Sequence, residues 1–193
     1  MSNSPKSEFA PNQLLREIHS RSRRTPGQLP RLNIRKIISG GQTGADRAGL
    51  DFGLANYIPI GGWCPKGRRA EDGIVPTRYP LLEHPQYSYQ PRTIQNIQEA
   101  DFTVIFARAP LSPGSQLTLN QCQRLGKRHV WLHDFPNAEA DANLLRVALQ
   151  RFDGVLNVAG SRESKCPGIH QHVLQVLQLA IAQPRTPTEQ ELN

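Results

Sequence analysis

The residues with the clearest chemical potential lie in the stretch KIISGGQTGADRAGL, positions 36–50. A short apolar run ends in two glycines, and an amphipathic run rich in small residues follows directly. Gly40 and Gly41 permit backbone angles closed to other residues and let a ligand approach the main chain. The amino end of the helix that follows offers unpaired N–H groups and a partial positive charge, which suits an anion. The stretch predicts a phosphate-binding loop made of Gly40, Gly41, Gln42, Thr43, Gly44 and Asp46.

The polar side chains of this loop fit a phosphorylated ligand. Thr43 can cap the helix or bond a phosphate oxygen, and Gln42 adds an amide. Asp46 can bond backbone amides, or lie near a ribose hydroxyl or a metal. The pattern is neither GxGxxG nor GxxxxGK[ST], so its specificity is moderate. The alternative is a tight strand-to-helix turn that holds no ligand.

A second loop, GGWCPKGRRAEDG at 61–73, carries cations beside two acids. Its position after a strand predicts a clamp for a phosphate or carboxylate, formed by Lys66, Arg68 and Arg69. The alternative is a cluster of surface ion pairs with little energetic weight. Trp63 either stacks on a flat ring or anchors the loop, and Cys64 is expected to line the site as a thiol.

Two further helix starts complete the candidate site. PGSQLT places Gly114, Ser115 and Thr118 at a helix amino end, which predicts a second anion site. Arg92 and Asn96 open another helix, where an arginine is unfavourable for the helix dipole unless it faces something negative. A solvated helix end is the equal alternative.

The elements that must position these residues alternate along the chain between strands and helices. This alternation predicts βαβ units, a mostly parallel sheet of about five or six strands and a Rossmann-like three-layer α/β fold. Gly, Pro, Ser and basic residues gather after the strands, at the edge where open α/β sheets bind ligands. Strands are expected at 34–39, 58–62, 102–107, 128–133 and 154–160, and helices at 44–57, 92–100, 115–126, 140–152 and 168–183.

The remaining regions are expected to be less regular. Residues 61–91 form a long loop with a short edge strand at YPLLEH, and their aromatic residues argue against disorder. Residues 1–32 are expected to be a disordered basic tail, 33–183 the ligand-binding domain and 184–193 a polar tail. The net charge is +7, but residues 1–35 contribute +5 of it, from seven basic residues less two acidic ones. The folded part is therefore not strongly basic, so nucleic acid could bind only through the tail, for which a solvated extension is the favoured interpretation.

The composition argues against a disulfide-rich protein, a membrane-spanning protein and a metal-binding protein. Three separated cysteines without a CxxC motif predict a reduced, cytoplasmic protein with no disulfide framework. No apolar run reaches the roughly 18 residues that a membrane span needs. The histidines form no recognisable metal-binding set, so we expect no metal site.

The motifs together resemble a known family over residues 34–182. SGGQTGADRAGLD, GGWCPKGRRAEDG, RTIQN and LNVAGSRESKCPGI are similar to the putative molybdenum carrier proteins, a branch of the SLOG superfamily of Rossmann-like nucleotide-binding domains. The resemblance implies binding of molybdenum cofactor (molybdopterin) or a related nucleotide by a carrier or storage protein. The cofactor's terminal phosphate would be the anion held by the glycine-rich loop. A homo-oligomer and molybdoenzymes are the expected partners.

Two rival functions remain open within the superfamily. Phosphoribohydrolases use a Gly-Gly-x-Gly-Thr loop followed by a glutamate, but PGSQLTLNQ lacks the second glycine and the acid. A nucleotide hydrolase would use Asp46, Glu71 or Asp72 for acid–base chemistry. DNA-processing protein A has a similar Ser-Gly-Gly opening, so the third hypothesis is a module that binds single-stranded nucleic acid.

Overall fold

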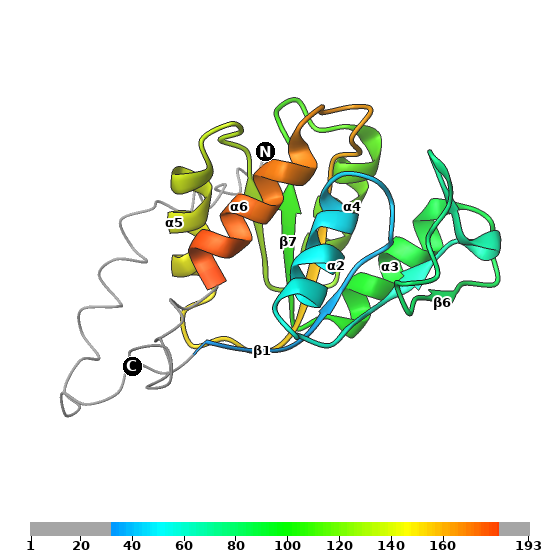
Figure 1. Ribbon diagram of the computed structural model, residues 1–193, viewed down its shortest axis with the longest axis horizontal. Coiled ribbons are helices and arrows are strands. Elements are labelled where there is room, and N and C mark those ends of the chain that lie inside the picture. The colour runs from blue at the N-terminus through cyan, green and yellow to red at the C-terminus, as the bar shows by residue number, and fades with distance from the viewer. Residues whose placement is uncertain (1–31, 182–193) are drawn as a thin grey trace, which may run out of the picture.

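A computed structural model describes residues 32–181, and its centre is a five-stranded parallel sheet (Figure 1). The strand order is β2-β1-β9-β7-β8, so the last strand in the sequence lies in the middle of the sheet. All four pairings between neighbours are parallel. The strands are β1 (Asn33–Ile38), β2 (Ile60–Gly61), β7 (Phe102–Phe106), β8 (His129–Leu132) and β9 (Asp153–Gly160).

Helices cover both faces of the sheet, which makes the fold a three-layer Rossmann-like domain (Figure 1). On one face α2 packs against α6, and α6 packs against α5; on the other, α3 packs against α4. The helices are α2 (Ala45–Ala55), α3 (Tyr89–Glu99), α4 (Pro113–Arg124), α5 (Ala138–Ala148) and α6 (Ile169–Ile181).

The main core follows from the apolar character of the central strands. Every residue of β7 is buried, as expected for a parallel strand with helices on both faces. Val158 of β9 is fully buried, and Gly49 of α2 lies so close that an added Cβ would stand 2.5 Å from the Val158 Cβ. This close approach sets α2 tightly against the sheet and fixes where its amino end lies.

The 61–91 segment folds as a small lobe beside the sheet. It contains the pair β3 (Trp63–Cys64) and β6 (Leu82–Glu83), the hairpin β4 (Arg69–Ala70) and β5 (Gly73–Ile74), and the 3₁₀ turn η1 (Lys66–Arg68). A second buried cluster supports it, with fully buried Val75 and Tyr79 packed near Leu50 of α2. The strand expected within YPLLEH exists as β6, but it pairs with β3 and not with an edge of the main sheet.

The predicted fold class is confirmed, with boundaries shifted by a few residues. The largest shift is at the end of α5, which lies at Ala148 instead of residue 152. The helix α3 starts at Tyr89 instead of residue 92, and Pro91 lies in its first turn, where the missing N–H is not needed. The two predicted tails fall outside the described residues, except for residue 32. No helix among residues 32–181 is long and apolar enough to cross a membrane.

Candidate functional site

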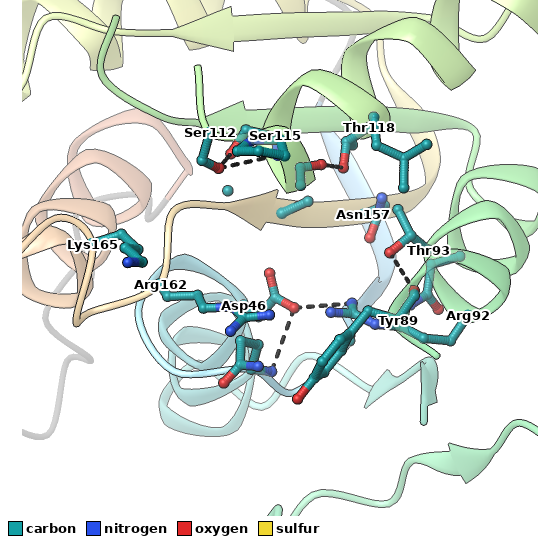
Figure 2. A pocket seen from close by; sticks show the side chains of 18 residues that line it. Asp46, Tyr89, Arg92, Thr93, Ser112, Ser115, Thr118, Asn157, Arg162 and Lys165 are labelled. Atoms are coloured by element: carbon teal, nitrogen blue, oxygen red, sulfur yellow. Dashed lines mark hydrogen bonds and ion pairs between the residues drawn. The ribbon is translucent and has the colours of Figure 1, made fainter. Parts of the chain in front are cut away.

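A cavity of about 280 Å³ lies at the carboxyl ends of the central strands (Figure 2). Four parts of the chain meet there: the loop after β1, the first turns of α3 and α4, and the end of β9 with the loop that follows. The lining residues are Gly40, Gln42, Asp46, Tyr89, Arg92, Thr93, Asn96, Ser112, Pro113, Gly114, Ser115, Leu117, Thr118, Asn157, Ala159, Gly160, Arg162 and Lys165.

The amino end of α4 opens onto this cavity. Pro113 occupies the first turn, and the N-cap Ser112 accepts a hydrogen bond from the Ser115 backbone N–H at 3.3 Å. The space beside Gly114 is open, because a Cβ built there would meet no atom within 4 Å. With Arg162 and Lys165 lining the same cavity, this end of α4 has the features of an anion-binding site.

The amino end of α2 is filled by the protein itself. The Ala45 N–H donates to the Ser161 carbonyl at 3.1 Å, and the Thr43 N–H to Gln42 Oε1 at 3.0 Å. Gly44 adopts φ 75°, and a Cβ there would lie 2.5 Å from the Ser161 oxygen and 2.7 Å from the Glu163 nitrogen. The chain after β9 therefore packs where an anion on this helix end would lie.

A buried ion pair forms the side of the cavity nearest α2. Asp46 Oδ2 lies 3.1 Å from Arg92 Nη1, and the two side chains are only 6% and 11% exposed. The Gln42 N–H also donates to Asp46 Oδ2, at 3.4 Å. Burial raises the pKa of Asp46 above its ordinary value, although the Arg92 charge opposes this rise.

Tyr89, the one aromatic residue among those lining the cavity, is surrounded by cations. The guanidinium carbons of Arg162, Arg69 and Arg92 lie 4.8, 5.1 and 5.8 Å from the ring centroid. Each distance is within the range of a cation–π contact. The tyrosine therefore links the lobe, α3 and the loop after β9 at one wall of the cavity.

The family comparisons agree with this architecture. The model of the circularly permutated YpsA SLOG family matches residues 37–181. The chain belongs to this family. A crystal structure of a "putative molybdenum carrier protein" from Syntrophus aciditrophicus SB is 42% identical in sequence, covers 77% of this chain and 96% of its own, and superposes with a TM-score of 0.73. No curated protein matches.

These matches confirm the resemblance inferred from the motifs, both to the SLOG superfamily and to the proteins named as molybdenum carriers. In this SLOG domain the structure brings together eight of the fifteen residues predicted for the site. They come from three segments that are far apart in the sequence: the loop after β1 with the start of α2, the helix α3 and the helix α4. The eight that line the cavity are Gly40, Gln42, Asp46, Arg92, Asn96, Gly114, Ser115 and Thr118.

The other seven predicted residues lie outside the lining of the cavity. Gly41 and Gly44 shape the loop through positive φ angles of 73° and 75°. Thr43 donates its hydroxyl to Glu71, which ties the loop to the tip of the lobe. Trp63 donates its ring N–H to Glu99 at 2.8 Å, so it anchors the lobe to α3.

The cations of the second loop are engaged within the lobe. The Arg68 guanidinium group donates hydrogen bonds to four carbonyl oxygens of the lobe at 2.9–3.1 Å and so holds the lobe together. The four carbonyls belong to Val75, Pro76, Tyr79 and Leu81. Lys66 lies over the Tyr87 ring at 5.1 Å. Arg69 lies over Tyr89 and also donates to the Tyr87 carbonyl at 3.2 Å. These contacts favour a structural role for the loop over the predicted clamp.

Sequence reasoning missed the cations after β9. Arg162 and Lys165 line the cavity but are absent from the residues predicted for the site, although both lie in the loop AGSRESKCPG after β9. That loop is rich in Gly, Ser and basic residues, which was the available signal. Tyr89 is also absent from the residues predicted for the site, because the helix was expected to begin at residue 92.

The cysteine and histidine side chains that could be reactive are held within the fold, outside the lining of the cavity. Cys64 was expected to line the site but is fully buried in the lobe, and burial raises the pKa of its thiol. His172 contacts Asp141 at 2.8 Å in the main core, and His170 contacts Asp51 at 3.0 Å. Residues 32–181 contain no group of three or more His, Cys, Asp or Glu placed to hold a metal ion.

Proposed function

We propose that this protein binds a phosphorylated, nucleotide-like ligand in the cavity and carries it without changing it, with molybdenum cofactor as the leading ligand. The observation that supports this most is the open amino end of α4 facing the cavity that Arg162 and Lys165 also line. Backbone N–H groups, hydroxyls and cations together are the groups that recognise a phosphate.

The cavity fits the phosphate-bearing part of such a cofactor. Gly114, Ser115, Arg162 and Lys165 would hold the terminal phosphate. The bound group would supply its metal and redox chemistry to an acceptor enzyme. The volume of about 280 Å³ is at the lower end for a ligand pocket, so part of a large ligand would extend outside. The name of the relative from Syntrophus aciditrophicus SB supports the choice of ligand.

The first test is to identify what co-purifies with the full chain. The protein is isolated without oxygen, and the released ligand is analysed by mass spectrometry with molybdenum measured on the same sample. Arg162→Ala is expected to lower ligand occupancy, because losing a charged hydrogen-bond donor weakens binding roughly 10- to 100-fold. Arg124→Ala is the matched control, since Arg124 lies at the other end of α4 and bonds Gln121.

Two outcomes would contradict the proposal. Equal occupancy in the Arg162 and Arg124 variants would place the ligand elsewhere, and a purified protein that binds no phosphorylated compound would exclude a carrier of this kind. If the bound compound is a nucleotide and molybdenum is absent, the proposed site stands and the nucleotide replaces molybdenum cofactor as the proposed ligand.

The hydrolase alternative depends on Asp46. Of the three acids considered from the sequence, Asp46 alone lines the cavity; Glu71 bonds Thr43 and Ser164, and Asp72 pairs with Arg47. Its raised pKa suits proton transfer. Product formation from a panel of nucleotides would favour this alternative over a carrier. The nucleic-acid hypothesis rests on the N-terminal tail, which lies outside the described residues.

A further inference from the structure

The outward face of α6 differs in composition from that of the other helices. The helix contains no Asp, Glu, Lys or Arg, whereas each of the other four helices within residues 32–181 contains at least one. Its exposed side chains are Gln171, Gln175, Gln178 and Leu179. The solvent-facing side of a surface helix normally bears charged residues. An outer helix without them has the composition of a contact surface.

A groove of about 640 Å³ lies along this face of α6. The end of α2 and the first residue of α5 border it, in agreement with the place of α6 between these two helices in Figure 1. The nine lining residues include no acid, lysine or arginine: Phe52, Ala55, Asn56, Ala138, Gln171, Leu174, Gln175, Gln178 and Leu179. Apolar side chains with amides at the rim suit the apolar side of an amphipathic helix.

The basic N-terminal tail contains a segment with the sequence pattern of such a helix. In PNQLLREIHS, positions 11–20, the apolar residues are Leu14, Leu15 and Ile18. At about 100° per residue these three lie within about 100° of one another around a helix, and Arg16 lies opposite them. Asn12 is a favoured residue for the helix N-cap.

The C-terminal tail does not share this pattern. Leu192 is the one large apolar residue of 182–193, and Pro184 and Pro187 would interrupt a helix there. Of the two segments outside the described residues, the N-terminal one is therefore the better match for the groove.

The N-terminal segment can reach the groove of its own molecule. The chain enters the sheet at Asn33, whose N–H donates to the Phe152 carbonyl, just beyond α5, at 2.9 Å. Arg146, near the end of α5, donates to the carbonyl of the groove residue Leu179 at 2.7 Å. The stretch 20–32 can span up to about 45 Å when extended. A domain of this size has a radius of gyration of about 15 Å, so the tether is long enough.

The groove is small for a contact between two copies of the chain. Nine residues line it, whereas a stable interface engages roughly 20–30 residues on each partner. A segment of the same chain needs fewer contacts, because its tether gives it an effective concentration on the order of millimolar. The size of the groove therefore favours an internal segment over a second copy.

We propose that residues 12–19 form a short amphipathic helix that lies in the groove along α6 of the same molecule. Leu14, Leu15 and Ile18 face the groove, and Arg16 faces solvent. The inference goes beyond the proposed function and does not depend on it, because the groove shares no lining residue with the cavity.

The test is hydrogen–deuterium exchange of the full chain, read by mass spectrometry of its peptides. The amides of residues 14–19 are expected to exchange at least roughly tenfold more slowly than in an unstructured peptide of the same sequence. An isolated helix of this length is marginal in water, so such protection reports docking. Because the contact is within one molecule, the protection should not change when the protein is diluted.

Leu179→Lys tests the groove, because it places a charge among the lining residues. The variant is expected to lose the protection of residues 14–19. Leu144→Lys is the matched control and should keep the protection, since Leu144 is 47% exposed, close to the 43% of Leu179, and does not line the groove. Gln175→Lys, at an exposed position in the groove, repeats the test if Leu179→Lys does not fold.

The double variant Leu14→Gln/Ile18→Gln tests the segment. It removes apolar contacts while glutamine keeps the helix propensity, so the protection should again be lost. Arg16→Gln is its matched control and should keep the protection, because Arg16 lies on the opposite side of the expected helix.

Three results would overturn the proposal. The first is a wild-type protein in which residues 14–19 exchange as fast as the unstructured peptide. The second is protection that Leu179→Lys and Gln175→Lys leave unchanged. The third is protection that falls on dilution as a dimer becomes a monomer by light scattering, which would assign the groove to a second copy.

Discussion

The amino ends of α2 and α4 lie at the same edge of the sheet and each has a glycine at its start, yet they differ in what occupies them. The end of α2 is closed by the Asp46 carboxylate and by the backbone of residues 161–163. The end of α4 is bordered by open space at Gly114. The anion-like partner of α2 is thus part of the chain, whereas the amino end of α4 is the place where the proposed ligand would lie.

This difference shows that a glycine can have opposite uses at two helix ends. Gly44 is required because another segment of the chain approaches it, whereas Gly114 leaves room beside the cavity. Three substitutions, Arg92→Met, Gly44→Ala and Glu71→Gln, test what holds the amino end of α2 closed.

Arg92→Met tests the charge that closes the end of α2. Removing one member of a buried ion pair typically costs about 3–5 kcal/mol, so we expect a loss of that size in the free energy of unfolding at neutral pH. The folded-state pKa of Asp46 is already raised, so its ionisation lowers stability as the pH rises through that pKa. Without Arg92 the pKa rises further, and the loss should shrink as the pH falls.

Denaturant unfolding from pH 4 to pH 8 measures the effect of Arg92→Met. The double variant Arg92→Met/Asp46→Asn should recover much of the stability. A pH-independent loss that the double variant shares would show that Arg92 contributes through packing instead of charge.

Gly44→Ala tests the steric closure of the same end. A positive φ and a contact of 2.5 Å with a backbone oxygen combine strain with overpacking, so we expect a loss of about 2–4 kcal/mol. Gly114→Ala is the matched control and should stay within about 1 kcal/mol of the wild type, since it meets no atom and gains helix propensity. Thermal unfolding of the two variants measures both. Equal losses would mean that the two helix ends are not different in the way described.

Glu71→Gln tests the link between the lobe and the α2 loop. Burial acts to raise the pKa of Glu71, but hydrogen bonds from Ser164 and Thr43 outweigh it and lower the pKa. A lowered pKa adds stability at neutral pH, and this stability is lost as the pH falls through the folded-state value. The group is exposed, so the variant should lose less than about 1 kcal/mol at pH 7 and match the wild type in acid. A difference that persists below pH 3 would contradict this origin.

The order of strands and helices was predictable from the sequence, because apolar strands and amphipathic helices are local patterns. The start of α3 was misplaced since Pro91 reads as a helix stop, although it is tolerated in a first turn. The pairing of β6 with β3 inside the lobe depends on long-range packing that no local pattern records.

The candidate site was predictable only in part. Its glycines, Arg92 and Asp46 carry local signals, but which helix end stays open depends on where the chain after β9 packs. Arg68 illustrates the limit: its type and position suggest ligand binding, whereas its guanidinium is engaged by carbonyls of the lobe. Side-chain partners are set by the tertiary fold and not by the spacing of charges.

The central position of β9 has a consequence for how the molecule assembles. Its neighbours β1 and β7 both precede it, and Ser39 Oγ donates to the Val158 carbonyl 119 residues further along the chain. Contacts this distant in sequence carry a large loop-closure entropy and form slowly. During synthesis β1 and β7 leave the ribosome before β9. The sheet therefore cannot become continuous until β9 has been made. The segment that closes the amino end of α2 and carries Arg162 and Lys165 follows β9 directly, so the cavity is completed in the final stage of folding, and a nascent chain that stops short of this segment lacks one of the cavity's walls.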